Sequence, residues 1–188
     1  MGKLIVFNSI TLDGYFTGEG GDLSWAYSGE KDPEWDEFVK SNASGDGMLL
    51  FGRVTYDMMK SYWPTPMALQ NDPVVAAGMN AMPKVVFSRT MESATWNNTT
   101  VIKDNIVDAV RKLKADSERG MVILGSGTIV SQLASEGLID EYQMVILPLA
   151  IGKGRTMFEG MKGKLALRLK SSRVFGNGKV VLCYEPTS

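Results

Sequence analysis

Residues 49–56 read Leu49-Leu50-Phe51-Gly52-Arg53-Val54-Thr55-Tyr56, an apolar run that passes through one glycine into a helix-like segment. The run begins at Met48 and lies between glycines at 47 and 52, a pattern typical of a strand that is covered on both faces. The helix from Arg53 ends before Trp63-Pro64-Thr65-Pro66, because prolines oppose its continuation. A buried strand that leads directly into a helix is a basic unit of α/β proteins, so this stretch indicates the fold class.

The same succession recurs further along the chain. Residues 121–124 are apolar, Gly125-Ser126-Gly127-Thr128 follow, and a helix then presents Ile129, Val130, Leu133 and Ala134 on one face. Two junctions of strand, glycine and helix therefore lie in one chain.

The remaining segments extend this pattern in both directions. We expect a first strand over 3–10, a glycine-rich loop from Thr11 to Trp25, and a helix from Asp32-Pro33 to about Ala43, with Asp32 as its cap. A third helix is expected over about 72–80. Short strands are expected over 84–88 and 99–103, and a helix capped by Asp104 follows them.

The last third of the chain has a different character. Residues 140–147, 165–174 and 179–184 are strand-like, and Asn177-Gly178 predicts a hairpin because both residues tolerate positive φ. We therefore predict one α/β domain over residues 1–188, with a mixed sheet that is parallel in the middle and antiparallel at its C-terminal end.

Composition and charge exclude several functional classes. Twenty Lys and Arg against 21 Asp and Glu leave a formal net charge of −1, so we expect neither nucleic acid nor a membrane as partner. The chain has no histidine, which excludes Ser-His-Asp and Cys-His catalysis and histidine-ligated metal sites, and we expect no metal. The single cysteine, Cys183, fits a reducing compartment, and the apolar run from Leu4 to Phe7 is too short for a signal peptide. A cytoplasmic protein is the natural expectation.

Both junctions can bind phosphate. Free N–H groups at a helix start, helped by the helix dipole, favour an anion, and Arg53 can add a bidentate grip at the first junction. Paired glycines at the second junction would let a diphosphate approach the backbone, although the spacing is not that of a Rossmann site. Each junction alone is equally consistent with a tight turn. Together, on parallel strands of one sheet, they indicate a long, multiply charged ligand.

Five motifs in a fixed order carry a resemblance over nearly the whole chain. They are Ser9-Ile10-Thr11-Leu12-Asp13-Gly14, residues 50–56, Lys84-Val85-Val86-Phe87-Ser88-Arg89-Thr90, Gly125-Ser126-Gly127, and Leu138-Ile139-Asp140-Glu141 leading to Pro148, Gly152, Gly154 and Phe158. Their order resembles the dihydrofolate-reductase-like superfamily, and within it the C-terminal reductase domain of bacterial riboflavin-biosynthesis deaminase-reductases and their stand-alone relatives. The resemblance implies a three-layer fold, with helices on both faces of the mixed sheet.

The resemblance also implies a map of the cofactor, which would be NADPH. Gly52, Arg53, Val54 and Thr55 would bind phosphates on one side, and Gly125, Ser126, Gly127 and Thr128 would take the pyrophosphate. Ser88 and Arg89 would hold the adenosine end, where an arginine suits a 2′-phosphate and favours NADPH over NADH. The loop from Thr11 to Trp25 would cover the nicotinamide as a lid, with Asp13 and Gly14 at its base. For Arg89, the alternative to a cofactor contact is an exposed cation at the end of a strand. For Asp13-Gly14, the alternative to the base of a lid is an ordinary turn.

Catalysis at such a site requires few side chains, because the nicotinamide supplies the hydride. In dihydrofolate reductases a carboxylate on the first helix serves proton transfer, and Asp36 stands at about that place; Asp13 is the second candidate catalytic residue. An exposed helix-start carboxylate is the plain interpretation of Asp36, because Glu34 and Glu37 suit the helix dipole equally well. Met58, Met59, Tyr62 and Trp63 either line a substrate pocket or belong to the core.

The implied activity is NADPH-dependent reduction of a C=N or C=O group in a heterocyclic or ribosylated pyrimidine, as in 5-amino-6-(5-phosphoribosylamino)uracil reductase. Two departures limit this assignment. The usual lysine of the first strand is absent, because Val6, Phe7 and Asn8 stand there, and the chain has no zinc deaminase motif. A dihydrofolate or pterin reductase, a non-catalytic NADPH-binding module and a site for another nucleotide stay open as alternatives. We also expect a homodimer, because a second copy commonly covers exposed sheet edges.

Overall fold

The computed structural model describes residues 1–27 and 29–187 and forms one eight-stranded sheet with helices on both faces. The strands lie in the order β5-β4-β3-β6-β1-β7-β10-β9. Their bounds are β1 Leu4–Thr11, β3 Met48–Gly52, β4 Lys84–Phe87, β5 Thr99–Ile102, β6 Met121–Leu124, β7 Glu141–Leu147, β9 Leu167–Val174 and β10 Val180–Pro186.

The sheet is mixed, as predicted. All pairs from β5 to β7 are parallel, and β10 and β9 are antiparallel to their neighbours. The parallel part therefore reaches the β5 edge rather than occupying only the middle. The carboxyl ends of all the parallel strands lie on the same side of the sheet. The predicted cofactor-binding residues follow those strand ends.

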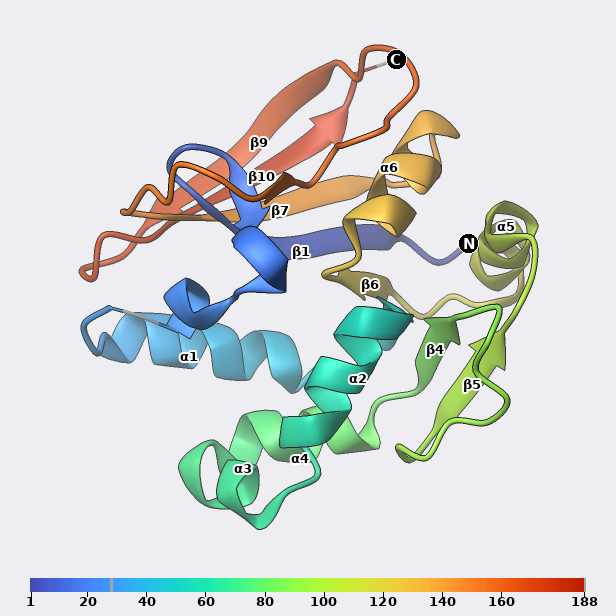
Figure 1. The fold of residues 1–188 in the computed structure, drawn as a ribbon, viewed down its shortest axis with the longest axis horizontal. Coiled ribbons are helices and arrows are strands. Elements are labelled where there is room, and N and C mark those ends of the chain that lie inside the picture. The colour runs from blue at the N-terminus through green and yellow to red at the C-terminus, as the bar shows by residue number, and fades with distance from the viewer. Residues whose placement is uncertain (28, 188) are drawn as a thin grey trace.

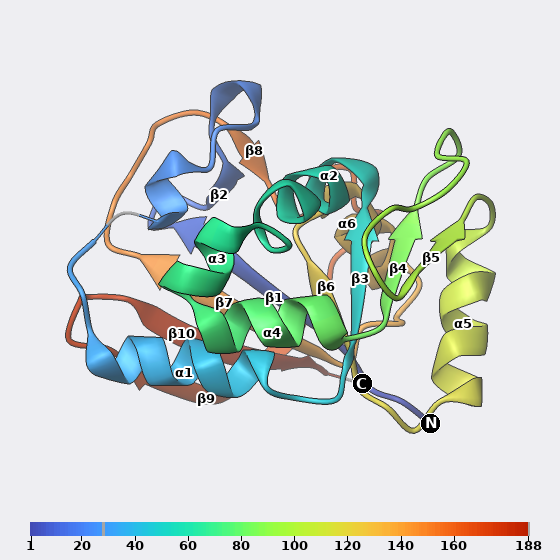
Figure 2. The same cartoon turned by 90° about the horizontal axis from the view of Figure 1, so that it is seen from below.

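Helices cover the two faces in separate groups (Figures 1 and 2). The four helices of one face are α1 Pro33–Ala43, α2 Arg53–Tyr62, α3 Pro66–Asn71 and α4 Pro73–Ala81. The other face carries α5 Ile106–Asp116 and α6 Gly127–Ser135. Buried Leu50 and Val85 pack toward α5 and α6, while their neighbours Phe51 and Val86 pack toward the first group, as the alternation of strand side chains requires. Within the described residues, no helix combines the length and the apolarity needed to cross a bilayer.

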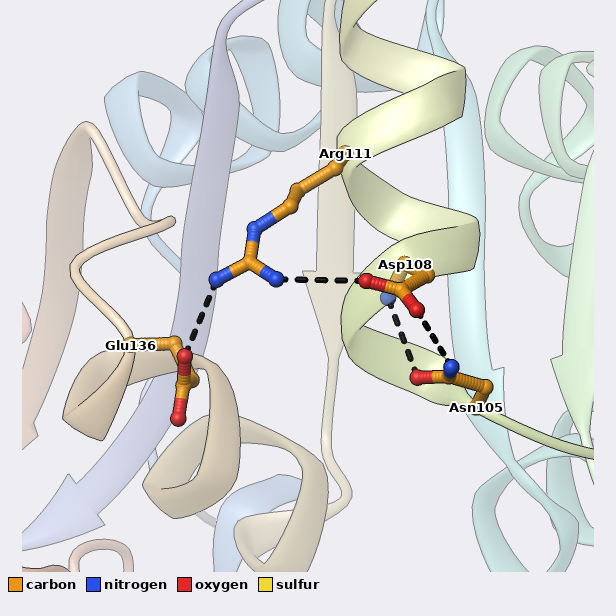
Figure 3. Close-up of polar contacts among 4 residues, drawn as sticks. All are labelled: Asn105, Asp108, Arg111 and Glu136. Atoms are coloured by element: carbon orange, nitrogen blue, oxygen red, sulfur yellow. Dashed lines mark hydrogen bonds and ion pairs between the residues drawn. The ribbon is translucent and has the colours of Figure 1, made fainter.

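Helix α1 begins as predicted at Asp32-Pro33, because the Asp32 carboxylate accepts the N–H groups of Glu34 and Trp35. The predicted cap of α5 was wrong by one residue. The cap is Asn105 and not Asp104. Asn105 lies in the left-handed region at φ 49°, and its side-chain oxygen accepts the N–H of Asp108. Asn tolerates this conformation better than other non-glycine residues. Figure 3 shows this cap and Arg111, which binds both Asp108 and Glu136 at the end of α6.

Three other local predictions differ from the structure. The helix α3 was missed, although Thr65 caps it and Pro66 stands at its first position. The glycine-rich loop contains the short strand β2 Tyr15–Thr17, which pairs with β8 Arg155–Thr156, and the 3-10 turns η1 Glu19–Gly21 and η2 Ser24–Tyr27. In the β9–β10 hairpin only Gly178 has positive φ, at 82°. The predicted hairpin itself is confirmed, and hydrogen bonds from Phe175 N–H to the Lys179 carbonyl and from Gly178 N–H to the Phe175 carbonyl close its three-residue loop.

Candidate functional site

The two predicted junctions lie side by side. β3 and β6 are neighbouring parallel strands in which Leu50 pairs with Ile123. Helix α2 begins at Arg53, immediately after β3, and α6 begins at Gly127, with two residues between it and the end of β6. Both helix N-termini therefore lie at the same edge of the sheet, where their first N–H groups have no preceding turn to accept them.

Ser126 joins the two junctions. The Gly52 N–H donates to the Ser126 hydroxyl at 2.6 Å, and that hydroxyl donates to the Thr55 hydroxyl at 3.2 Å. The two side chains predicted to bind phosphate are thus bonded to each other, and one N–H of the first junction is already satisfied. The hydroxyl of Ser126 fixes how far apart the two helix starts lie.

The backbone at Ser126 has the conformation from which anion-binding nests are built. Ser126 has φ 58° and ψ 63°, a left-handed conformation that is uncommon for a residue with a Cβ, and Gly127 is the first helical residue. A left-handed residue followed by a right-handed one turns successive N–H groups toward one point, which makes a nest that suits an anion. Such a nest would use the N–H groups of Ser126, Gly127 and Thr128.

The glycines at these junctions have a packing role that the sequence patterns did not indicate. A Cβ on Gly52 would lie 2.6 Å from the Ser126 hydroxyl oxygen, and a Cβ on Gly125 would clash with the Thr55 side chain. A Cβ on Gly127 would lie 2.9 Å from the Phe16 ring. These glycines allow the two junctions and the first loop to pack closely against one another.

Asn8 on β1 is a site residue that sequence reasoning missed. Its side chain is buried, and its amide oxygen accepts the Gly125 N–H at 2.6 Å. Its amide nitrogen faces the Gly125 carbonyl at 3.5 Å and the sulfur of Met157 at 3.4 Å. Asn8 therefore holds the Gly125 peptide, and with it the left-handed turn, in place. The available signal was a polar residue directly after the apolar run from Leu4 to Phe7.

The cations of the predicted site differ in their contacts. Arg53 is half exposed, and its Nε lies 2.6 Å from an oxygen of Asp57. Arg89 is exposed after the end of β4, and within the described residues its guanidinium has no hydrogen-bond or ion-pair partner. Lys103, which the sequence analysis missed, follows β5 and lines the same cleft as Arg89. The Ser88 hydroxyl accepts the Met91 N–H at 3.1 Å and so shapes the turn that carries Arg89.

The predicted lid is folded against the rest of the site. The Asp13 carboxylate accepts the Thr11 hydroxyl at 2.5 Å and the N–H groups of Gly152 and Ile151 at 2.7 and 3.1 Å. The Thr11 hydroxyl and these N–H groups lower the pKa of Asp13, because they stabilise its charged form. Asp13 thus ties the base of the loop to the segment after β7. Further along the loop, Phe16 and Trp25 are buried, and Phe16 lies against Gly127.

One open cleft connects nearly all of the predicted site residues. Among the residues lining it are Asp36, Gly52, Arg53, Val54, Thr55, Ser88, Arg89, Gly125, Ser126, Gly127 and Thr128. Asp36 is exposed on the flank of α1, and Asp13 is not among the lining residues. Met58, Met59, Tyr62 and Trp63 also line the cleft, and Met59 and Trp63 pack in addition against the core beneath it.

A model of the RibD C-terminal domain matches residues 2–181. The chain belongs to the RibD C-terminal domain family. This membership confirms the resemblance that the five motifs carry, and it spans both helix N-termini, the first loop and the antiparallel strands up to β10.

Solved structures of RibD-type and related proteins share the fold. A putative riboflavin biosynthesis protein from Shewanella sp. PV-4 has a TM-score of 0.76 at 24% identity, with 99% of each chain covered. The diaminohydroxyphosphoribosylaminopyrimidine deaminase/5-amino-6-(5-phosphoribosylamino)uracil reductase of Thermotoga maritima has a TM-score of 0.67 at 13% identity, over 99% of this chain and 57% of that one. Dihydrofolate reductase from Enterococcus faecalis, complexed with NADP(H), has a TM-score of 0.66 at 14% identity, over 99% and 97%. The predicted dihydrofolate-reductase-like fold is confirmed.

Proposed function

We propose that this protein is an NADPH-dependent reductase of a heterocyclic or ribosylated pyrimidine substrate. Its membership of the RibD family supports a reductase of RibD type. The observation that carries the proposal is the pair of helix N-termini at Arg53 and Gly127, held side by side by Ser126 in a cleft that continues to Arg89. A dinucleotide has a diphosphate between two nucleosides, so it needs an anion-binding centre within a long cleft.

The residues of the cleft fit NADPH along its length. The nest at Ser126 and the first N–H groups of α2 suit the diphosphate, and Arg53 can exchange its exposed contact with Asp57 for a phosphate at little cost. Arg89 and Lys103 bring two cations to the ends of neighbouring strands, as a 2′-phosphate would require.

The bound nicotinamide would supply the hydride, and the chain would position it and exclude water. Phe16, pressed against Gly127, and the buried Trp25 form the apolar part of the first loop. Asp36 lines the cleft, where its carboxylate would contact the substrate and pass a proton to it. Asp13 does not line the cleft, and its carboxylate is occupied by the Thr11 hydroxyl and the N–H groups of Ile151 and Gly152, so we assign proton transfer to Asp36.

The test is steady-state oxidation of NADPH, followed by the cofactor's absorbance, with a panel of ribosylated pyrimidines and pterins. Turnover with one of them is expected. Oxidation of dihydrofolate or a pterin alone would favour a pterin reductase, whereas tight NADPH binding without oxidation would contradict an enzyme and favour a binding module.

A variant tests the cofactor site itself. Arg53→Ala should weaken NADPH binding by roughly 1.5 to 3 kcal/mol, the usual contribution of a charge-assisted hydrogen bond. The matched control is Arg111→Ala, which removes an arginine of similar exposure that does not line the cleft. Equal NADPH affinity for Arg53→Ala and Arg111→Ala would contradict the role of Arg53.

A further inference from the structure

Lys179 is a buried cation at the end of the cleft nearest α1. It stands just before β10, its residue is only 8% exposed, and its ammonium lies 4.5 Å from the centroid of the Trp35 ring. The hairpin loop before it is fixed, because the Asn177 N–H donates to the Asp32 carboxylate at 3.0 Å. Lys179, Trp35 and Asp36 all line the cleft.

The ammonium of Lys179 has no hydrogen-bond acceptor within residues 1–27 and 29–187. The other two buried lysines differ: Lys84 donates to three carbonyl oxygens, and Lys114 donates to the Leu138 carbonyl and to Asp140. The Asp32 carboxylate accepts the N–H groups of Glu34, Trp35 and Asn177 and forms no hydrogen bond with the Lys179 ammonium. Burying a charge without an acceptor is costly, and the indole face offsets only part of that cost.

Asp36 supplies the complementary group. Asp36 follows Trp35 on α1, and the Lys179 ammonium lies against the Trp35 ring, so both groups face the same end of the cleft. Burial lowers the pKa of Lys179, and the charges of Asp36 and Asp32 oppose this shift. The side chain of Asp36 has no hydrogen-bond or ion-pair partner in the described part of the chain. The cleft therefore presents a free donor and a free acceptor at the same end, beside an aromatic ring.

We propose that Lys179 is a specificity-determining residue that selects oxo-heterocycles: it donates to a ring carbonyl while Asp36 accepts from the neighbouring ring N–H. A lactam edge, as in uracils and oxo-pterins, carries an acceptor next to a donor and matches this pair. An amino-substituted ring presents N–H groups to the ammonium and does not match it. The inference rests on the proposed function in taking this end of the cleft as the substrate side.

The test compares two small ligands with the cofactor-free protein by titration calorimetry. The ligands are 6-aminouracil, which has the lactam edge, and 2,4,6-triaminopyrimidine, in which amino groups replace both oxo groups. The unmodified protein should bind 6-aminouracil more tightly. Lys179→Met should weaken that binding about tenfold or more, which corresponds to a charge-assisted hydrogen bond, and should leave or raise the affinity for the triamine.

The matched control is Lys112→Met, the same substitution at an exposed position of α5 on the other face. It should bind both ligands as the unmodified protein does. Equal losses for the two ligands in Lys179→Met, unchanged binding of 6-aminouracil, or no preference in the unmodified protein would each overturn the proposal.

A second measurement needs no variant. Lysines of the unmodified protein are acetylated with N-hydroxysuccinimidyl acetate and quantified by peptide mass spectrometry. Lys179 lines the cleft, so prolonged labelling should acetylate it, more slowly than the exposed Lys112. Saturating 6-aminouracil should slow acetylation of Lys179 further and leave that of Lys112 unchanged. No protection by 6-aminouracil, or no labelling of Lys179 in the ligand-free protein, would overturn the proposal, because an ammonium closed to the reagent is also closed to the ligand. NADPH binding is measured separately, so a protein that binds 6-aminouracil through Lys179 but ignores NADPH contradicts the proposed function and not this inference.

Discussion

Lys84 shows how a single buried charge stabilises this fold. It is 1% exposed, and its ammonium donates to the carbonyl oxygens of Met82 at 2.7 Å, Asn97 at 3.1 Å and Asn80 at 3.2 Å, with the Trp96 ring 4.5 Å away. Lys84→Met would leave these carbonyls without their donor and should lower the free energy of unfolding by about 3 kcal/mol. Urea unfolding measures this, with Lys112→Met as the exposed control that should change by less than about 0.5 kcal/mol. Equal stability of the two variants would contradict the role of Lys84.

The same residue predicts a pH dependence of stability. Burial lowers the pKa of Lys84 from 10.5 to about 8 in the folded protein. Between these values the unfolded chain holds a proton that the folded chain has released, so this group makes the free energy of unfolding rise with pH across the window. The stability difference between the unmodified protein and Lys84→Met should therefore grow from pH 8 to 10.5 in urea unfolding. A flat or falling difference would show that burial does not lower this pKa.

At the scale of elements, the contact between the two helix starts depends on Ser126. Ser126→Ala would remove the acceptor of the Gly52 N–H and the donor to Thr55, and should cost about 1 to 2 kcal/mol of stability. NADPH binding should weaken as well, because the two N-termini lose their fixed spacing. Thermal unfolding and NADPH titration measure the two effects.

Ser126→Gly separates the hydroxyl from the backbone strain. Glycine adopts φ 58° without penalty, so this variant should lose the hydrogen bonds yet be up to about 1 kcal/mol more stable than Ser126→Ala. If both variants are as stable as the unmodified protein, the hydroxyl of Ser126 does not join the junctions.

The elements that sequence patterns predicted well are those with strong local signals. Helix α1 has a capping aspartate and a first-turn proline, and β3 and β6 are apolar runs next to glycines, so their positions followed directly. β8 has only two residues and exists because β2 pairs with it, which no local pattern shows. Asn8 and Lys179 were missed for the same reason: their roles depend on Gly125 and Trp35, which are distant in sequence.

At the scale of the whole molecule, the order of the strands determines which distant segments meet. β3 lies between β4 and β6, so the ends of all three strands reach one cleft, and Arg89 comes to lie on the same edge as Gly52 and Ser126. The sequence predicted the mixed sheet but not its strand order, because strand order depends on contacts between distant segments.

The expected homodimer stays a prediction. β5 and β9 are the free edges of the sheet, and most residues of β9 are exposed, including Leu169 at 52% and Val174 at 70%. A second copy would remove one such edge from solvent. Sedimentation velocity should give a species of twice the chain mass of 20.6 kDa, and a monomer over the accessible concentration range would contradict this prediction.

Cofactor binding should raise the stability of the whole molecule, because the cleft joins segments from β1 to α6 that separate on unfolding. A ligand at about 100 times its Kd adds about 2.7 kcal/mol to the folded state, which for a domain of this size raises Tm by about 5 to 10 °C. NADPH should produce this shift, and NADH at the same concentration a smaller one, because it offers no 2′-phosphate to Arg89 and Lys103. Thermal melts with NADPH, NADH and ATP measure the three shifts. Equal Tm shifts with NADPH and NADH would contradict the role assigned to Arg89 and Lys103. A larger Tm shift with ATP would indicate that another nucleotide is the ligand.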